Sequence, residues 1–446
     1  MEIDRFINVI NKSLPRVAND IPEKNKLNSF FPMRTKGNEF EWDNVIGIIL
    51  RTLLRKKIEN YSYERFIKDC QLSFGNKLGE EEFWNTINEM YFENKDIFNI
   101  SPEMLLFHSQ KGEYAQSDDR FASLFINLMK GTKIQEFTRN VNFIEREIIK
   151  VFTKNTKNYE FDSLTEDAYL PYLSFVFIKD LNFLSSRPNY FLSEIKKFLS
   201  FYLFTYTAQI SLALGDWKVA EEPQSKPLYF IMDHERASNE RTHIRNHGYK
   251  LFQDSCYKIF PILTMLELLQ ADNGKNSKKT PLWAILRKIK ETEYNDVSEH
   301  LKDFAHAFRT QRELNIEFNQ PINQATHWLE EIIKLAMAQF QVGHRVNINK
   351  RYVKDIEQII AKGFFQSRGR SGRVLILNQD QIVLLTNLAV NNNERIRFQD
   401  LIISFQQRGV YFDKQSQQEL IKFYDRIGNV ERMSDSGDAI YVRKTI

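Results

Sequence analysis

The sequence is poor in cysteine and lacks the short motifs by which many enzymes are identified. Cys70 and Cys256 are its two cysteines in 446 residues, too few for a disulfide framework or a set of zinc-knuckle ligands. No phosphate-binding GxxxxGK(S/T) loop, dinucleotide fingerprint or nucleophile elbow occurs in the chain. The sequence therefore predicts no bound cofactor and no ATP hydrolysis, and it favours a protein that is not an enzyme.

A secretory leader is also missing from the start of the sequence. Together with the low cysteine count, this predicts a protein of the reducing cytoplasm. One uncharged run of 18 residues, at 198–215, approaches the length that crosses a bilayer. It contains hydroxyl and amide side chains such as Ser200, Thr205 and Gln209, which weaken membrane insertion. We therefore expect a buried helix of a globular body and no membrane contact.

Charge is nearly balanced over the whole chain but not along it. The formal net charge is +4. Residues 341–446 contain 17 Lys and Arg against 11 Asp and Glu, a net of +6, which leaves −2 for residues 1–340. An excess of positive charge at one end favours a polyanionic partner there, and double-stranded DNA is the partner that we expect.

Helical periodicity dominates the sequence, and the predicted fold class is therefore mainly α. Residues 1–220 are expected to form a helical body. Residues 221–362 are expected to form a second helical subdomain, with one long helix over 239–270. Arginine and glycine then mark a connecting arm at 363–376. A winged helix-turn-helix domain is expected at 377–446.

The winged-helix prediction begins with three helical patterns. Apolar residues recur at helical spacing within 382–389, 398–405 and 420–427. Gly409 and Gly428 follow the second and third patterns, where a left-handed C-terminal residue carries no steric cost for glycine. The patterns therefore predict three short helices, each with one apolar face.

A capping signal and a hairpin signal complete the module. Ser416 is expected to cap the third helix, with Glu419 three residues later in the capping-box position. Small polar residues at 434–438 suit a tight turn between strands at 430–433 and 439–442. Three helices followed by a hairpin is the order of a winged helix.

A winged helix commonly places its third helix in the major groove of DNA and its wing against the phosphate backbone. This geometry identifies the candidate DNA-binding residues of the module: Lys414, Gln415, Gln417, Gln418, Lys422, Arg432, Arg443 and Lys444. Winged helices also dock other proteins, and polar residues on an exposed helix face are often only solvated. Both alternatives stay open at this point.

Three further arginines lie in the connecting arm. Arg368, Arg370 and Arg373 are separated by glycine and serine, and a guanidinium group is shaped to bind phosphate through two parallel hydrogen bonds. We expect a flexible basic arm that contacts DNA or an acidic partner surface. The alternative is a plain hinge whose arginines only aid solubility.

Weak candidates for a metal site follow an apolar stretch in the middle of the chain. Residues 228–232 predict a buried strand, and Asp233 and Glu235 come directly after it. His243 and His247 lie four apart on a predicted helix, close enough to share a metal ion. The spacing matches no established metal motif, and the alternative is a solvated helix with surface ion pairs. The sequence thus predicts no resident metal.

Two blocks of the C-terminal sequence are similar to a known protein family. They are LNQDQIVLLTNLAV at 377–390 and RGVYFDKQSQQELIKFYDRIGNVERMSDSGDAIYVR at 408–443, with the SDSGDA turn as the most specific part. This region resembles the DptG (DndG) family of DNA phosphorothioation-dependent restriction proteins. The family belongs to a bacterial defence system that restricts DNA lacking the phosphorothioate mark, in which the partner chains DptF and DptH supply ATPase and translocase functions. The resemblance carries over no catalytic residue.

One functional hypothesis and two alternatives follow. The resemblance implies a non-catalytic DNA-binding and scaffolding subunit of a multi-protein restriction complex for antiviral defence, acting on unmodified DNA. Its protein partners would be ATPase and translocase subunits resembling DptF and DptH. The first alternative is a metal-dependent nuclease subunit of the same system, built around Asp233, Glu235, His243 and His247. The second is a winged-helix transcription regulator.

Overall fold

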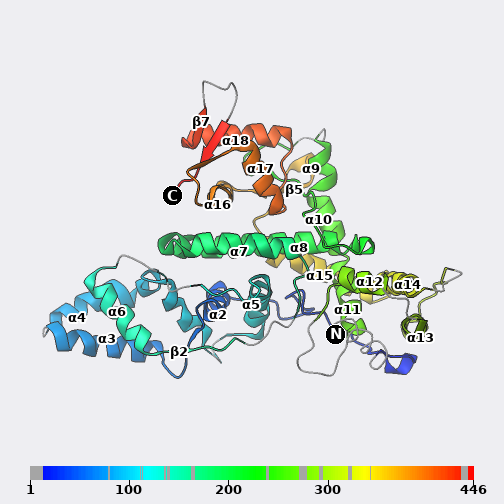
Figure 1. Cartoon of the computed structure of the whole chain (residues 1–446), viewed down its shortest axis with the longest axis horizontal. Helices are drawn as coiled ribbons and strands as arrows, with labels where there is room; N and C mark the ends of the chain where they lie inside the picture. Colours follow the sequence, from blue (N-terminus) through cyan, green and yellow to red (C-terminus); the bar gives the residue numbers. More distant parts are fainter. Residues whose placement is uncertain are drawn as a thin grey trace. The chain divides into compact units, whose positions relative to one another are not determined.

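The chain is mainly helical, as predicted. The computed structural model describes residues 14–78, 81–110, 112, 114–134, 137, 141–161, 166–237, 241–270, 279–290, 295–319, 324–341, 343–432 and 440–446. It divides into two compact units (Figure 1). The larger unit comprises Met1–Gly37, Thr165–Ser174 and Phe201–Ile446, and the smaller unit comprises Asn38–Leu164 and Phe175–Ser200.

This division differs from the four segments expected from the sequence. Two of its boundaries, after Ser174 and after Ser200, fall inside the continuous helices α7 (Pro171–Ser185) and α8 (Pro188–Ala213), and none falls in the polar linker near residue 220. An unbroken helix carries no glycine or proline at such a boundary, and sequence composition therefore does not reveal it.

In the smaller unit, α2 (Trp42–Leu54) packs against η4 (Pro102–Ser109) and α5 (Gln116–Leu128), and α3 (Tyr63–Leu78) packs against α4 (Glu81–Ile87) and α6 (Phe143–Lys154). Gly47 of α2 lies so close to η4 that an added Cβ would come within 2.7 Å of the Leu105 carbonyl oxygen, which explains why this helix face carries glycine. The elements of this unit before α7 are α2 (Trp42–Leu54), β1 (Lys56–Ile58), α3 (Tyr63–Leu78), α4 (Glu81–Ile87), η2 (Asn88–Glu93), η3 (Asp96–Asn99), η4 (Pro102–Ser109), α5 (Gln116–Leu128), α6 (Phe143–Lys154) and β2 (Thr156–Asn158). β1 and β2 pair in antiparallel fashion, with Lys56 opposite Asn158.

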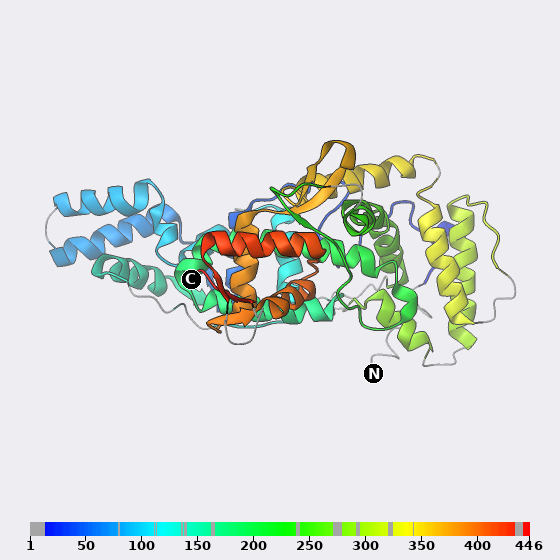
Figure 2. The same cartoon turned by 90° about the horizontal axis from the view of Figure 1, so that it is seen from above.

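The larger unit contains a helical part in which α13 and α14 pack side by side (Figure 2). Its elements are η1 (Ala18–Asp20), η5 (Trp217–Val219), α9 (Thr242–His247), α10 (Tyr249–Cys256), α11 (Ile259–Leu269), α12 (Leu282–Lys290), α13 (Asn295–Gln311), α14 (Ala325–Ala338) and α15 (Arg345–Ile359). The prediction of one long helix over 239–270 is therefore wrong. The chain breaks at Gly248, where the backbone leaves the helical region with φ −104° and ψ −131°, and again before Ile259.

The uncharged run at 198–215 is a buried helix, as predicted. Residues 201–211 of α8 are all buried, and their hydroxyl groups bond to the backbone: the Thr207 hydroxyl donates to the Leu203 carbonyl over 2.8 Å. Such back-bonding is how a polar side chain is accommodated inside a packed helix. Across the described part of the chain, the helices lack the combination of length and apolar character that a bilayer crossing requires.

Residues 363–376 form a hairpin, where the sequence predicts a flexible arm. β4 (Phe365–Ser367) and β5 (Arg373–Leu377) pair in antiparallel fashion, and β3 (Ile231–Met232) adds to β5 in parallel. The strand predicted at 228–232 is thus present only over its last two residues. The apolar side chains of this small sheet pack with α9 in one buried cluster of Ile231, Ile244, Val374 and Ile376. The η6 turn (Gly369–Ser371) connects the two hairpin strands.

The C-terminal part of the larger unit is a small α/β module (Figure 1). Its order is α16 (Gln379–Val390), β6 (Arg395–Arg397), α17 (Phe398–Gln407), α18 (Lys414–Ile427), β7 (Val430–Arg432) and β8 (Ile440–Arg443). The strands are antiparallel in the order β6-β8-β7. The three predicted helices are present and β6 was not predicted. Residues 433–439, which hold the expected turn at 434–438, lie outside the described residues.

Gly409 ends α17 with a left-handed backbone, at φ +79°. A Cβ there would lie 2.7 Å from Nε2 of Gln209. Gln209 has little freedom to move, because its Oε1 accepts from the Tyr172 hydroxyl over 2.9 Å and from the Lys226 amide over 2.8 Å. Gly428 has the same backbone geometry, at φ +75°, with open space around it.

We expect Gly409→Ala to destabilise the protein more than Gly428→Ala. Both variants pay about 1–2 kcal/mol for left-handed strain, and Gly409→Ala adds about 1–3 kcal/mol of crowding against Gln209. The apparent Tm of the two purified variants provides the measurement. Equal shifts in Tm would show that the Gln209 contact does not constrain the end of α17.

Candidate functional site

The start of α18 is capped by Asp413, not by Ser416 as predicted. The Asp413 carboxylate accepts a hydrogen bond from the Ser416 amide over 2.9 Å, and the helix begins at Lys414. Ser416 is thus inside the first turn and completely buried. An aspartate at this position is a strong N-cap residue, and its charge also suits the positive end of the helix dipole.

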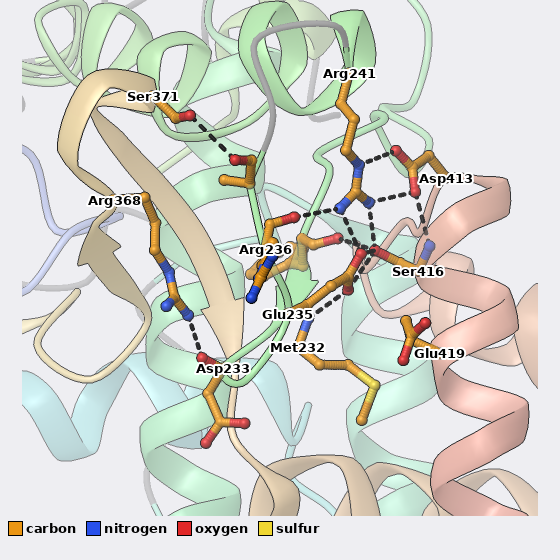
Figure 3. Close-up of polar contacts among 12 residues, drawn as sticks. Met232, Asp233, Glu235, Arg236, Arg241, Arg368, Ser371, Asp413, Ser416 and Glu419 are labelled. Atoms are coloured by element: carbon orange, nitrogen blue, oxygen red, sulfur yellow. Dashed lines mark hydrogen bonds and ion pairs between the residues drawn. The ribbon is translucent and has the colours of Figure 1, made fainter.

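A buried arginine from a distant part of the chain holds this cap in place (Figure 3). Arg241 is 8% exposed, and it binds Asp413 through two hydrogen bonds, Nε to Oδ2 over 2.8 Å and Nη2 to Oδ1 over 2.5 Å. Its Nη1 forms an ion pair with Glu235, which is also buried. One guanidinium group therefore balances two carboxylates in the interior.

Ser416 closes the network, which we call the Arg241 cluster and which consists of Glu235, Arg241, Asp413 and Ser416. The Ser416 hydroxyl accepts from Arg241 Nη2 over 2.7 Å and donates toward the Glu235 carboxylate over 2.9 Å. The Glu235 carboxylate also accepts a hydrogen bond over 3.1 Å from the amide of Met232, the last residue of β3. The cluster therefore joins the small sheet to the first turn of α18.

The electrostatics of the cluster favour ionised Asp413. Burial raises the pKa of this carboxyl group, but hydrogen bonds from Arg241 and from the Ser416 amide outweigh burial and leave the pKa below its ordinary value. The charged form of the cap is thus the stable one at neutral pH.

The exposed side of α18 carries several of the predicted DNA-binding residues. Leu420, Phe423 and Tyr424 are buried against the module. Four candidates lie on the exposed side: Lys414, Gln415, Gln418 and Lys422. Gln417 is partly buried, and its amide group donates to the Phe412 carbonyl over 2.9 Å. Gln417 is thus positioned to brace the cap rather than to reach outward.

Most of the basic candidates near α18 and the strands have an acidic neighbour. Lys422 pairs with Glu419 at 2.8 Å and Arg432 pairs with Asp425 at 2.8 Å. On β8, Arg443 pairs with Glu431 at 2.6 Å. Exposed pairs of this kind contribute little to stability, and the basic partner can exchange a carboxylate for a phosphate.

Two further basic residues, Arg395 and Lys444, lie on or next to the strands of this sheet. Arg395 of β6 shares Glu431 with Arg443 at 2.5 Å, and the three residues connect all three strands of the sheet. Lys444 donates to the carbonyl oxygens of Asn391 and Asn393, each over 3.1 Å. Lys444 therefore fastens the end of β8 to the turn after α16.

The arginines of the β4–β5 hairpin make contacts inside the protein. Arg368 donates to the Asp233 carbonyl oxygen, and Arg373 donates to the Tyr249 hydroxyl over 2.6 Å and pairs with Glu357 at 3.1 Å. The side chain of Arg370 lies outside the described residues. These bonds explain why the segment is an ordered hairpin, and they give two of its three arginines structural partners.

The residues considered as weak candidates for a metal site interact with different partners. Glu235 belongs to the Arg241 cluster, Asp233 contacts His234 at 3.3 Å, and His243 stacks on Tyr229 with ring centroids 4.8 Å apart. The His243 and His247 rings are 6.1 Å apart. Among the described residues, no group of three or more His, Cys, Asp or Glu side chains is placed to hold a metal ion.

The sequence reasoning missed the residues that position α18. An aspartate three residues before Ser416 is itself a capping signal, so Asp413 could have been recognised. Arg241 could not, since it lies 172 residues away from Asp413 in the chain.

A search of protein-family models and a search of curated proteins found no match to this chain.

Removal of the Arg241 side chain is expected to loosen α18. In Arg241→Ala, the buried carboxylate of Glu235 and the partly buried carboxylate of Asp413 lose their cation, at a cost of about 3–5 kcal/mol for a buried pair. Amide hydrogen exchange over residues 414–427 is expected to accelerate accordingly. Arg245→Ala, a change at an exposed residue of α9, the helix that begins directly after Arg241, should leave the exchange nearly unchanged. Similar exchange in both variants would contradict a clamping role for Arg241.

The lowered pKa of Asp413 predicts an acid-sensitive contribution to stability. The ionised carboxylate stabilises the fold above its unfolded pKa of about 3.9, and this contribution disappears as the pH falls through the folded pKa. Asp413→Asn is therefore expected to lower the apparent Tm at pH 6 and to flatten its decline below pH 4. Asp400→Asn, at an exposed position of α17, is the control and should decline as the wild type does.

Proposed function

We propose that residues 377–446 form a winged helix that binds duplex DNA through α18. The observation that supports this most directly is the element order helix, strand, helix, helix, strand, strand, with the sheet order β6-β8-β7. A first strand that pairs with the last, beside three helices, is the topology of winged-helix domains. α18 corresponds to the recognition helix of that fold.

The distribution of side chains on α18 supports contact with a polyanion. Its outer side carries Lys414 and Lys422 with Gln415 and Gln418 between them. Amide groups of glutamine can read base edges, and lysine binds phosphate through charge. The strands add Arg432 and Arg443, which would lie toward the DNA backbone if α18 occupied the groove.

The Arg241 cluster supports a role in which the module is a fixed part of the larger unit. A recognition helix on a flexible tether loses orientational freedom on binding, which costs affinity. Here the first turn of α18 is held by a buried arginine from outside the module. DNA bound to α18 would thus take a defined orientation relative to the helices of this unit.

At the level of the cell, we propose a non-catalytic DNA-binding and scaffolding subunit of a DNA phosphorothioation-dependent restriction complex. The support is the resemblance of residues 377–390 and 408–443 to that family, in which ATPase and translocase subunits are the partners. The nuclease alternative gains no support from the geometry, because Glu235 is engaged by Arg241 and His243 by Tyr229. A transcription regulator remains the other alternative.

Duplex binding is expected to weaken with salt and to depend on α18. Loss of two phosphate contacts in the Lys414→Gln and Lys422→Gln double variant should reduce the slope of log K against log salt concentration by about 1.8. Fluorescence anisotropy with a 30-base-pair duplex measures this slope.

The matched control is Lys350→Gln with Lys354→Gln, two exposed lysines on α15. This control should keep the wild-type slope if the charge on α18 contributes specifically. An equal fall in slope for both double variants would mean that general positive charge, rather than α18, governs binding. Absence of duplex binding by the wild-type chain at low salt would overturn the proposed function.

Partner chains are tested separately by affinity purification of the tagged protein from its native host. Co-elution of an ATPase supports the complex. Co-elution of a single promoter fragment without protein partners would instead support a transcription regulator.

A further inference from the structure

A basic pocket lies in the smaller unit, apart from the module to which the proposed function applies. It has a volume of about 590 Å³, within the range of small-molecule sites. Its lining comes from the end of α2, the start of β1, the segment after α5 and the end of β2: Leu54, Arg55, Lys56, Lys133, Ile134, Asn158 and Tyr159. Three of these residues are cationic, and none of the described lining residues is acidic.

Arg55 has an unusual position in the wall of this pocket. It is the residue after α2 and has a left-handed backbone, at φ 54° and ψ 36°, which costs a non-glycine residue about 1–2 kcal/mol. Backbone strain of this kind tends to persist where the surrounding structure enforces it, often at ligand sites. In this protein a hydrogen bond holds Arg55 in that conformation, because the Arg55 carbonyl accepts from the Tyr159 amide over 2.8 Å.

The guanidinium group of Arg55 is held in place but incompletely bonded. Its Nη2 donates to the Gly131 carbonyl over 2.9 Å, and its charge lies 4.4 Å from the centre of the Phe161 ring. Its Nη1 is buried and has no hydrogen-bond partner among the described residues. A buried donor without a partner is costly, so a small movement of the guanidinium group toward an anion in the adjoining pocket would be favoured.

The rest of the wall suits a ligand with an uncharged organic part. Leu54, Ile134 and Tyr159 supply apolar and aromatic surface. The Tyr159 ring is fixed by Arg51, whose charge lies 5.2 Å from the ring centre. Asn158 can exchange hydrogen bonds with hydroxyl groups or ring nitrogens. The volume, moreover, exceeds what a bare phosphate ion would fill.

We propose that this pocket binds a small phosphomonoester of mononucleotide size, with its phosphate toward Arg55, Lys56 and Lys133 and its organic part against Leu54, Ile134 and Tyr159. A nucleotide and a sugar phosphate share this chemistry. The site lies in the smaller unit and uses none of the residues of α18, so a failure of DNA binding would leave this proposal standing.

The test is calorimetric titration of the full chain with four probes: adenosine 5′-monophosphate, ribose 5-phosphate, inorganic phosphate and adenosine. Binding of at least one phosphomonoester, at least tenfold tighter than adenosine and inorganic phosphate, is the expected result. The ratio between the first two probes identifies whether a base or only a sugar fills the apolar side. Affinity for adenosine or inorganic phosphate equal to that of both phosphomonoesters, or no binding of either phosphomonoester, would overturn the proposal.

Two variants assign the binding to this pocket. Lys133→Gln changes an exposed residue and should weaken phosphomonoester binding about tenfold, as loss of a charge-assisted contact does. Arg55→Lys keeps the charge but removes the fork of donors, and it should also weaken binding. Lys157→Gln is the matched control, because Lys157 lies on β2 beside the pocket but pairs with Glu59 at 3.3 Å. Equal losses for Lys133→Gln and Lys157→Gln would place the ligand elsewhere.

Discussion

The Arg241 cluster is the constraint on which the larger unit depends at its C-terminal end. A buried guanidinium group shared by two carboxylates and a hydroxyl has few alternative arrangements, because each polar atom would be left unpaired in any other. The cluster fixes the cap of α18, and through Glu235 and the Met232 amide it fixes the end of β3 as well. Besides stabilising the fold, the bonds of the Arg241 cluster set the direction in which α18 presents its exposed residues.

The charges around α18 show why net charge alone is a poor guide to a binding surface. Residues 341–446 have an excess of positive charge, yet Lys422, Arg432 and Arg443 each have a carboxylate within 2.9 Å. The positive potential is therefore partly cancelled at short range. Binding of a polyanion would require these pairs to open, and the gain per contact would be smaller than that of an isolated lysine such as Lys414.

Local signals in the sequence predicted what depends on local structure. Helical spacing identified the three helices of the C-terminal module, and Gly409 and Gly428 were correctly expected at helix ends with left-handed backbone. Features formed between distant segments were missed. β6 is three residues long, and its partner among the described strands is β8, at the far end of the module. The β4–β5 hairpin was predicted as a flexible arm because the contacts that order it come from β3, Glu357 and Tyr249, which lie elsewhere in the chain. Ser416 was predicted as the cap although Asp413, three residues earlier, is itself a strong capping residue; what the sequence could not show is that Arg241 binds the Asp413 carboxylate.

The pairing of β3 with β5 also has a consequence for synthesis on the ribosome. Ile231 lies opposite Ile376, and Arg241 binds a residue 172 positions further along the chain. Loop closure over such a span is slow compared with helix formation, and translation delivers the later partner many seconds after the earlier one. During that interval the edge of β3 has no β5 to pair with, and Arg241 has Glu235 beside it but not yet Asp413.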